Sequence, residues 1–378
     1  MPTEPAARAA SPSPSVERYG EGDTELWLPP TGSSRGPARR RAIFYNPAMA
    51  LDRDLNVAFA RVAERQGCPA WDAWEMLGAT GVRGLRLVHE TDAIGSLVIT
   101  ERDPEALVVL RRNAESVDPD RVTIVAGDAT SVPTGAPFDY VDLDPYGSPI
   151  PFLPALFQTL TDGAIAAVTA TDMMVLAGVT AGACQRIYGA RPVRGRLAPE
   201  SGLRILLAFL DREARARGFG IHPLLSYVQG HHVRTYIAID RSGLGRTSPL
   251  GVIDPATWEG PWIAGNGPFG PMWLGPLGDP EWVRLLRPPP VAARPKETAA
   301  FIARLIEESE VDRPFYYEPN ELARRVGRTE PPSVDALLAA LRARRARAVR
   351  GHPRAAAIRT DAPRAIVEEV ARNLGRPV

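Results

Sequence analysis

The residues with the clearest chemical potential are the tetrad Asp144-Pro145-Tyr146-Gly147, which follows the apolar run 138–143. That run predicts a buried strand, and open α/β sheets place their chemistry at strand ends. A carboxylate, a backbone carbonyl fixed at a proline and an aromatic ring offer two hydrogen-bond acceptors and a face for stacking. An exocyclic amine on a planar base requires these groups, so the tetrad indicates methyl transfer to a nucleobase nitrogen. The plainer alternative is a strand that ends in a turn, with Asp144 capping the next helix.

A glycine-bearing turn provides a second candidate site. It runs from Gly78 through Gly81 to Gly84, between an apolar run and a helical pattern. Glycines in such a turn let a ligand approach the backbone closely. The spacing alone is weak, because it also fits a dinucleotide-binding enzyme.

Acidic residues at the next strand ends bear on that choice. Glu101 follows the run 96–100, where a carboxylate can bind both ribose hydroxyls of NAD or of S-adenosylmethionine. Asp128 and Ala129 follow the next run and could contact the amine and a ring nitrogen of adenine. Carboxylates at three successive strand ends favour S-adenosylmethionine, and no hydride-transfer partner can be placed for a dehydrogenase. Surface carboxylates without a ligand are the alternative for Glu101 and Asp128.

Short apolar runs that alternate with helical patterns predict the sheet that positions these residues. The expected strands are 70–77, 96–100, 122–126, 138–143 and 164–171. The expected helices between and after them are 82–90, 104–117, 152–160 and 201–217. Such alternation is typical of a doubly wound, parallel α/β sheet. Two further runs, 223–229 and 233–240, predict a hairpin that closes the sheet in antiparallel fashion.

Changes in composition predict four segments. Residues 1–36 are rich in Pro, Ser, Gly and Ala, and we expect them to be partly disordered. The sheet occupies 37–240, and 241–295 is a Gly-, Pro- and Trp-rich connector that we expect to be irregular but ordered. Residues 296–378 form a smaller C-terminal domain, and its expected helices are 298–308, 319–326 and 333–347.

Overall composition indicates a soluble globular chain. With 378 residues, 44% hydrophobic and 24% charged, the chain is long enough for two compact domains. No apolar run could span a membrane and the first residues do not resemble a signal peptide, so we expect a cytoplasmic protein without membrane contact. The two cysteines, Cys68 and Cys184, are too few for a disulfide framework or a cysteine zinc site, and we expect no metal. A net charge of +1 excludes a uniformly cationic surface but not a local basic one.

A series of motifs resembles the tRNA (guanine-26 N2)-dimethyltransferase family. In chain order they are 44–54 (FYNPAMALDRD), 78–84 (GATGVRG), 142–149 (DLDPYGSP), 191–195 (RPVRG), 270–276 (GPMWLGP) and 358–363 (IRTDAP). The resemblance extends from about residue 40 to the C-terminus. It implies a class I methyltransferase fold, with a Rossmann-like and mostly parallel seven-stranded sheet, followed by a family-specific C-terminal domain. It also implies that the acceptor is guanine 26 of tRNA; whether one or two methyl groups are added, and whether guanine 27 is also accepted, stays open.

The resemblance implies S-adenosylmethionine as the cofactor. The residues that match the family at the cofactor site are Arg53, Gly78, Arg83, Glu101, Asp128 and Ala129. The two arginines would lie near the methionine carboxylate, Glu101 at the ribose, and the last two at the adenine. Ordinary salt bridges are the alternative for the arginines.

The resemblance also assigns the acceptor site. Asp144 would be the catalytic residue and, with the Pro145 carbonyl, would accept the protons of guanine N2. Tyr146 and Phe44 would stack on the base, although burial as a structural aromatic is an equal alternative for Phe44. Guanine 26 lies between two tRNA stems, so the base must be extruded to reach these groups.

Arginines between Leu341 and Thr360 predict contact with tRNA phosphates. This segment holds seven arginines and no acidic residue, and its candidates are Arg342, Arg345, Arg350 and Arg354. Such a cluster would make binding steeply dependent on salt. A solvated helix face is the alternative, and 35–41 is a weaker second candidate.

The chain departs from the family pattern in two places. Many family members carry a cysteine cluster before the motif at 270–276, but residues 241–269 lack cysteine, so we expect tryptophan packing to hold the connector. The family tends to have His-Glu where this chain has Pro199-Glu200, and Glu200 could retain a role there. His231 and His232 are expected in a turn.

Two other functions stay open: an rRNA or DNA amino-methylase, and a non-catalytic RNA-binding protein on the same scaffold.

Overall fold

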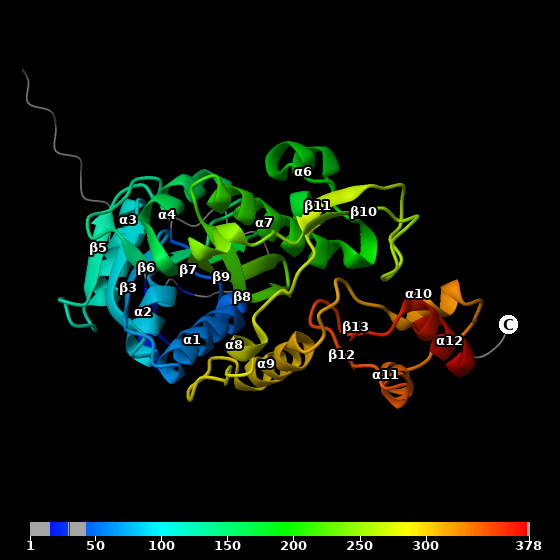
Figure 1. The fold of residues 1–378 in the computed structure, drawn as a ribbon. Coiled ribbons are helices and arrows are strands. Elements are labelled where there is room, and N and C mark those ends of the chain that lie inside the picture. The colour runs from blue at the N-terminus through cyan, green and yellow to red at the C-terminus, as the bar shows by residue number, and fades with distance from the viewer. Residues whose placement is uncertain (1–15, 29, 31–42, 376–378) are drawn as a thin grey trace, which may run out of the picture.

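A seven-stranded sheet forms the centre of the molecule, with strand order β5-β4-β3-β6-β7-β9-β8 (Figure 1). The computed structural model describes residues 16–28, 30 and 43–375. The strands of the sheet are β3 (Trp71–Glu75), β4 (Ile94–Glu101), β5 (Val122–Ala126), β6 (Phe138–Leu143), β7 (Leu160–Ala170), β8 (Gly220–Gln229) and β9 (His232–Asp240). Strands β3 to β7 are parallel, and β9 is antiparallel to both of its neighbours. The predicted doubly wound sheet and its closing hairpin are therefore confirmed.

Helices cover both faces of this sheet (Figure 1). They are α1 (Ala50–Arg65), α2 (Val82–Glu90), α3 (Pro104–Ala114), α4 (Leu153–Thr159), α5 (Met173–Leu176), α6 (Ala181–Tyr188) and α7 (Ala198–Arg215). Side chains of α1, α2 and α3 share one hydrophobic core with alternate sheet residues, and those of α4 and α7 share the other. Helices α2 and α3 start where the sequence predicts, α7 starts at Ala198 instead of 201, and α1, α5 and α6 were not predicted. The Asp103 side chain, for example, accepts hydrogen bonds from the amides of Glu105 and Ala106 and caps α3, which begins at Pro104.

The N-terminal segment contains a hairpin where we expected partial disorder. Strands β1 (Glu17–Glu21) and β2 (Thr24–Leu28) pair antiparallel, and Leu26 and Leu28 are buried. The backbone amide of Trp27 donates to Asn113 Oδ1 of α3 at 2.6 Å, which fixes the hairpin on the sheet domain. The expectation was wrong for these residues because the Pro- and Ser-rich flanks hid a short alternating strand pattern. The rest of 1–36, and the arginines at 35–41, lie outside the described residues.

The C-terminal part contains a second, smaller core. Its elements are α9 (Pro295–Ser309), α10 (Pro319–Arg325), α11 (Val334–Ala343), β12 (Ala348–Arg350), β13 (Ile358–Thr360) and α12 (Arg364–Leu374). The helix predicted over 333–347 is too long, because Arg345 adopts a left-handed φ of 63° and the chain then enters β12. Helix α9 packs on α1 instead of the smaller core: Ile302 and Leu305 share a core with the sheet domain. Packing therefore places α9 with the sheet, although its sequence lies in the segment expected to form the C-terminal domain.

The connector contains regular structure and is held by aromatic packing. Its elements are the paired strands β10 (Leu250–Ile253) and β11 (Phe269–Trp273) and the short helix α8 (Pro280–Val283). The ring of Trp258 contacts that of Phe315 edge-on, with 6.3 Å between centroids, and Trp262 contacts Tyr317 in the same way at 6.1 Å. These contacts join the connector to the C-terminal part, as the absence of cysteine from 241–269 predicts.

Candidate active site

Four parallel strands bring the predicted site residues to one edge of the sheet. Strand order reverses at β3, which pairs with β4 on one side and β6 on the other. In open α/β sheets such a reversal is where ligands bind, at the carboxyl ends of the strands. Gly78 follows β3 and Glu101 ends β4, while Asp128 follows β5 and Asp144 follows β6. The fold therefore gathers residues that lie up to 66 positions apart in sequence.

The glycine turn is packed tightly against the end of β4. A Cβ atom on Gly78 would lie 2.3 Å from Cγ2 of Ile99, and Gly81 has a φ of +75°. Both positions therefore need glycine. Glu101 holds the turn from the other side: its Oε2 accepts a hydrogen bond from the Ala79 amide at 2.7 Å. The Glu101 carboxylate is thus fixed beside the turn.

Arg83, at the start of α2, connects Asp144 to a buried charge network. Its guanidinium forms ion pairs with Asp144 and with Asp52, the latter at 2.7 Å, and its Nε lies 3.7 Å from Asp142. Burial and Arg234 oppose the charge, but these three carboxylates outweigh them and hold the pKa of Arg83 well above its usual value. Arg83 Nη1 is buried without a hydrogen-bond partner among the described residues. A buried, unsatisfied donor of this kind fits an anionic ligand.

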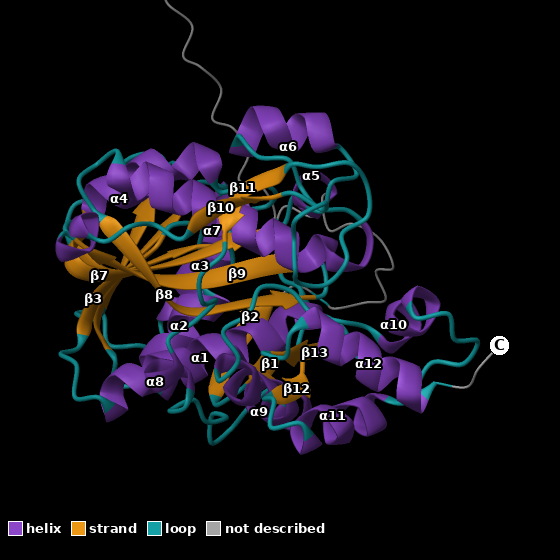
Figure 2. Cartoon of the chain, turned by 45° about the vertical axis from the view of Figure 1, so that its right-hand side comes forward, coloured by secondary structure: helices purple, strands orange, loops and turns teal. Residues whose placement is uncertain are grey.

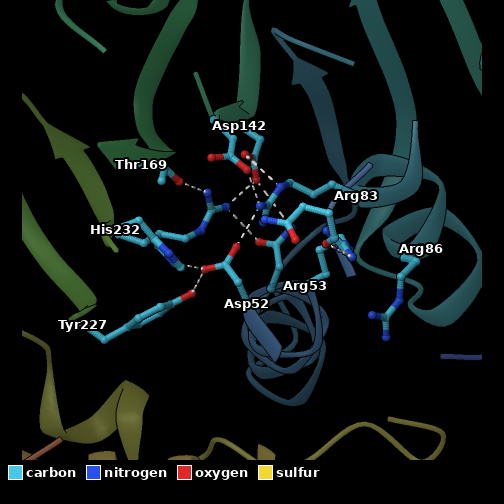
Figure 3. A network of polar contacts seen from close by, with 12 residues as sticks. Asp52, Arg53, Arg83, Arg86, Asp142, Thr169, Tyr227 and His232 are labelled. Atoms are coloured by element: carbon cyan, nitrogen blue, oxygen red, sulfur yellow. Dashed lines mark hydrogen bonds and ion pairs between the residues drawn. The ribbon is translucent and has the colours of Figure 1, made fainter. Parts of the chain in front are cut away.

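Asp52 on α1 is the centre of that network (Figure 3). It accepts a hydrogen bond from the Tyr227 hydroxyl at 2.7 Å, and His232 Nε2 lies 3.0 Å from the same oxygen. Burial raises the pKa of Asp52, but Arg83 and His232 outweigh burial and hold it well below its usual range. Asp52, Tyr227 and His232 were not predicted as site residues, and His232, expected in a turn, is the first residue of β9. They lie on α1, β8 and β9, and no local spacing links them.

Arg234 on β9 forms a second part of the network. It is fully buried and donates to Asp142 Oδ2 and to Thr169 Oγ1, each at 2.6 Å (Figure 3). Asp142 in turn lies opposite Glu75 in the pairing of β6 with β3. Burial, and then repulsion from Asp142, raises the pKa of Glu75 to about 8. Burial beside Asp142 therefore favours the protonated, neutral form of Glu75 in the folded protein.

We expect Glu75→Gln to remove part of the pH dependence of stability. The pKa of Glu75, about 8 when folded, exceeds the ordinary 4.5, so the folded state binds the proton more tightly. The stabilisation from Glu75 is complete below the unfolded pKa and is lost as pH rises towards the folded one, by roughly 1.4 kcal/mol per pH unit. Thermal unfolding should show that the stability of Glu75→Gln relative to the wild type increases from about pH 6 to about pH 9. The exposed change Glu259→Gln is the control, and parallel curves for the wild type and Glu75→Gln would refute the expectation.

Phe44 and Tyr146 form an aromatic pair at the tetrad. Their ring centroids are 4.5 Å apart with the planes at 69°, and Tyr146 is 60% exposed. The tetrad is tied to the end of β7, because the Gly147 amide donates to Thr171 Oγ1 at 2.6 Å and the Thr171 amide donates to Gly147 O at 2.9 Å. Tyr146 therefore presents a ring to solvent directly beside Asp144.

The other residues predicted at the cofactor site, Arg53, Asp128 and Ala129, differ in their exposure and in their contacts. The Arg53 guanidinium binds Glu21 of the N-terminal hairpin through two contacts, of 2.5 and 2.6 Å, so this residue forms an ion pair within the protein. Asp128 is partly exposed, and its carboxylate accepts hydrogen bonds from the amide and hydroxyl of Thr130. These two hydrogen bonds lower the pKa of Asp128. Ala129, next to it, is buried.

The arginines predicted to bind tRNA are spread over three elements. Arg342 on α11 donates to the backbone of Ala348, Arg350 on β12 pairs with Asp335, and Arg354 before β13 pairs with Glu318. Arg345 is exposed in the turn after α11. These side chains do not form one helical stripe.

Comparison with known proteins identifies the family. A family model described as N2,N2-dimethylguanosine tRNA methyltransferase matches residues 34–247 and 265–372. The chain belongs to this family. Two similar members of this dimethyltransferase family are the tRNA (guanine(26)-N(2))-dimethyltransferases of Thermococcus kodakarensis and Pyrobaculum calidifontis. The first is 34% identical over 371 residues, with 88% of this chain and 93% of the relative covered. The second is 32% identical over 339 residues, with 88% and 92% covered.

A solved structure of the dimethyltransferase family supports the same assignment. The complex of Trm1 from Pyrococcus horikoshii with S-adenosyl-L-methionine matches with a TM-score of 0.81 and 27% identity, covering 95% of this chain and 100% of that one. The resemblance predicted from the motifs and the predicted methyltransferase fold are therefore confirmed.

Proposed function

We propose that this chain transfers methyl groups from S-adenosylmethionine to N2 of guanine 26 in tRNA, first one and then a second. The observation that carries the proposal is the position of Asp144: it follows β6 at the point where strand order reverses, beside the glycine turn and Tyr146. Membership of the dimethyltransferase family names the acceptor. The sheet edge supplies the acceptor groups that an exocyclic amine needs. An rRNA or DNA amino-methylase has no comparable support.

The described residues fit S-adenosylmethionine, which supplies an electrophilic methyl group carried on a sulfonium. Arg83 Nη1, buried without a partner in the described part of the chain, would donate to the cofactor carboxylate. Gly78 lets the turn pack against the end of β4, which places it beside Glu101, and Glu101 would accept from the ribose hydroxyls. Asp128 and the Ala129 amide would contact the adenine. By the family motif Arg53 would lie near the cofactor carboxylate, although its guanidinium pairs with Glu21 in this structure.

Asp144 and Pro145 would prepare the acceptor amine. As N2 of guanine takes up the methyl group, positive charge develops on N2, and the Asp144 carboxylate would accept the proton that N2 then loses. The Asp144 carboxylate, oriented by its ion pair with Arg83, would accept a hydrogen bond from N2 and stabilise that charge. The Pro145 carbonyl, at the same turn, would accept the second N2 proton and complete the alignment.

We expect Tyr146→Ala to weaken base placement. Base stacking on an aromatic ring is worth about 1–3 kcal/mol, so kcat/KM for tRNA should fall by about 10-fold or more. Tyr146→Phe keeps the ring and should stay close to the wild type. Initial rates of methyl transfer measure both, and an equal loss in the two variants would show that the hydroxyl, not the ring, matters.

The function is tested by nucleoside mass spectrometry of unmodified tRNA transcripts incubated with the protein and S-adenosylmethionine. A transcript with guanine at 26 should yield N2-methylguanosine and then N2,N2-dimethylguanosine, and one with adenine at 26 should yield neither. A transcript with guanine at 27 alone tests the neighbouring position, and rRNA fragments and DNA test the other acceptors. Cofactor binding by calorimetry without any methylation would favour the non-catalytic alternative.

The partner and location follow from the same proposal. Among the described residues no group of His, Cys, Asp and Glu could hold a metal ion. In that part of the chain no helix is long and apolar enough to cross a membrane. Since the proposed substrate is tRNA, we infer that the protein acts in the cytoplasm.

A further inference from the structure

The segment between β7 and α7, residues 171–197, begins and ends at the sheet edge that carries Asp144. Strand β7 is parallel to β6 and therefore ends at the same edge. Strand β8 starts at the opposite edge, because it runs parallel to β7 through the intervening antiparallel β9. Helix α7 leads into β8, so α7 begins at the Asp144 edge and ends at the other. Both ends of the segment are thus at the edge of the candidate active site.

Hydrogen bonds fasten this segment to the tetrad. Thr171 exchanges two hydrogen bonds with Gly147, and the hydroxyl of Tyr188 lies 2.9 Å from that of Ser148, the residue after the tetrad. Helices α5 and α6 lie close together near β11 (Figure 2). A ligand that places its reacting base at Asp144 therefore passes over this segment.

The segment is rich in exposed arginines without acidic partners. Arg186, Arg191 and Arg194 are exposed, and none forms an ion pair with any described residue, although Arg191 stacks on the ring of Phe269. The fourth arginine of the segment, Arg196, pairs with Glu318. The one acidic residue of the segment, Asp172, accepts hydrogen bonds from the Tyr188 hydroxyl at 2.9 and 3.0 Å. This part of the active-site edge thus carries uncompensated positive charge.

The arginines of 341–360 differ in this respect. Five of them already have carboxylate partners, in the pairs Arg344–Glu369, Arg347–Glu310, Arg350–Asp335, Arg354–Glu318 and Arg359–Glu200. A phosphate must compete with those carboxylates, whereas an arginine without a partner needs only to release bound counterions. The number of arginines in the sequence therefore overstates how strongly 341–360 attracts RNA in comparison with 171–197.

A cavity continues the basic surface towards the C-terminal part. Its volume is about 210 Å³, and its lining includes Arg194, Arg196, Trp262, Tyr317, Arg324 and Arg325. Arg324 and Arg325 share the single carboxylate of Glu321, so this wall also has excess positive charge. Arginines interleaved with aromatic rings are typical of surfaces that hold RNA nucleotides.

We propose that residues 171–197 form the principal surface that holds the tRNA backbone next to the target guanine, with Arg186, Arg191 and Arg194 on the phosphates. The inference rests on the proposed function and adds the location of the RNA. It moves the main contact from the C-terminal arginines to a segment fastened to the catalytic tetrad. The partner is an RNA phosphodiester backbone that crosses the carboxyl edge of the sheet.

The test is the salt dependence of tRNA binding by the triple variant Arg186→Gln/Arg191→Gln/Arg194→Gln. We expect the slope of log Kd against log salt to fall by about three, one for each arginine, and the affinity at low salt to fall by at least about 10-fold. Binding of S-adenosylmethionine, followed by calorimetry, should not change. The charge-matched control is Arg217→Gln/Arg241→Gln/Arg246→Gln. These three residues come after α7 and β9 in the chain, where both elements end at the opposite edge of the sheet. The control should retain nearly the wild-type slope.

Two results would overturn the inference: an unchanged slope in the segment variant, or an equal loss in the control. A larger loss in Arg342→Gln/Arg345→Gln/Arg350→Gln than in the segment variant would return the main contact to the C-terminal arginines. If the triple variant fails to fold, each single Arg→Gln change should still lower the slope by about one. A wild type that binds tRNA through this surface but methylates no guanosine would refute the proposed function alone.

Discussion

Replacing Asp144 with alanine is expected to lower methyl transfer to guanine 26 by about 10²- to 10³-fold, the usual cost of removing a group that stabilises charge in a transition state. The Asp144 side chain is only 25% exposed, and its ion-pair partner Arg83 keeps a second carboxylate, Asp52. Stability should therefore change little, and the loss should appear in kcat more than in cofactor affinity. Single-turnover rates at saturating tRNA and S-adenosylmethionine measure the effect.

Asp144→Asn separates charge from hydrogen bonding at the same position. Asparagine keeps one acceptor oxygen but neither stabilises positive charge on N2 nor pairs with Arg83. We expect its rate to lie within about 10-fold of that of the alanine variant. A rate close to the wild type would show that an acceptor oxygen suffices and would contradict the role proposed for the carboxylate. Thermal unfolding and cofactor binding of both variants are the controls for folding.

Arg359→Met is expected to destabilise the protein by about 3–5 kcal/mol, as is typical when one member of a buried ion pair is removed. Arg359 on β13 is buried between Glu200 of α7 and Glu308 of α9, with contacts of 2.7 Å to each. It thus joins the smaller core to the sheet domain. The same ion pair gives Glu200 a structural role in the described structure, because its carboxylate binds both Arg359 and Arg204. Denaturant unfolding followed by tryptophan fluorescence measures the loss.

The effect of Arg359→Met should depend on pH. Burial raises the pKa of Glu308 and Glu200, but His352 and Arg359 outweigh burial at Glu308, and Arg359 and Arg204 outweigh it at Glu200. Both pKa values are therefore lowered, and the stabilisation they give is complete above the unfolded pKa and is lost as pH falls. Without Arg359 the two carboxylates protonate more readily. The difference in free energy of unfolding between Arg359→Met and the wild type should therefore be smaller at about pH 5 than at about pH 8.

Arg344→Met is the matched control for Arg359. Its partner is Glu369, and both side chains are more than 40% exposed. Removing this exposed pair should change the free energy of unfolding little at either pH. A similar cost for the two arginine variants would mean that the buried cluster does not join the two parts of the molecule.

Local sequence patterns gave much of the fold. Strands β5 and β6 and helix α2 begin and end where the alternation of apolar runs predicts. Their signals are local: an apolar run of the right length, a capping residue or a glycine where the chain must turn. Predictions were wrong where local pattern was masked or incomplete, as for β1 and β2 among Pro- and Ser-rich residues and for the end of α11.

The sequence by itself determined which residues stand at the ends of the parallel strands, because the strand pattern and the parallel topology place Glu101, Asp128 and Asp144 at one edge. Only the tertiary structure decided which charged groups are paired. Asp52 and His232 meet across 180 positions, and Arg359 meets Glu200 across 159. Such contacts form when helices and strands pack, and burial then makes each buried charge depend on its partner. For the same reason the sequence showed where arginines are dense, but only packing showed that those at 186, 191 and 194 lack carboxylate partners among the described residues.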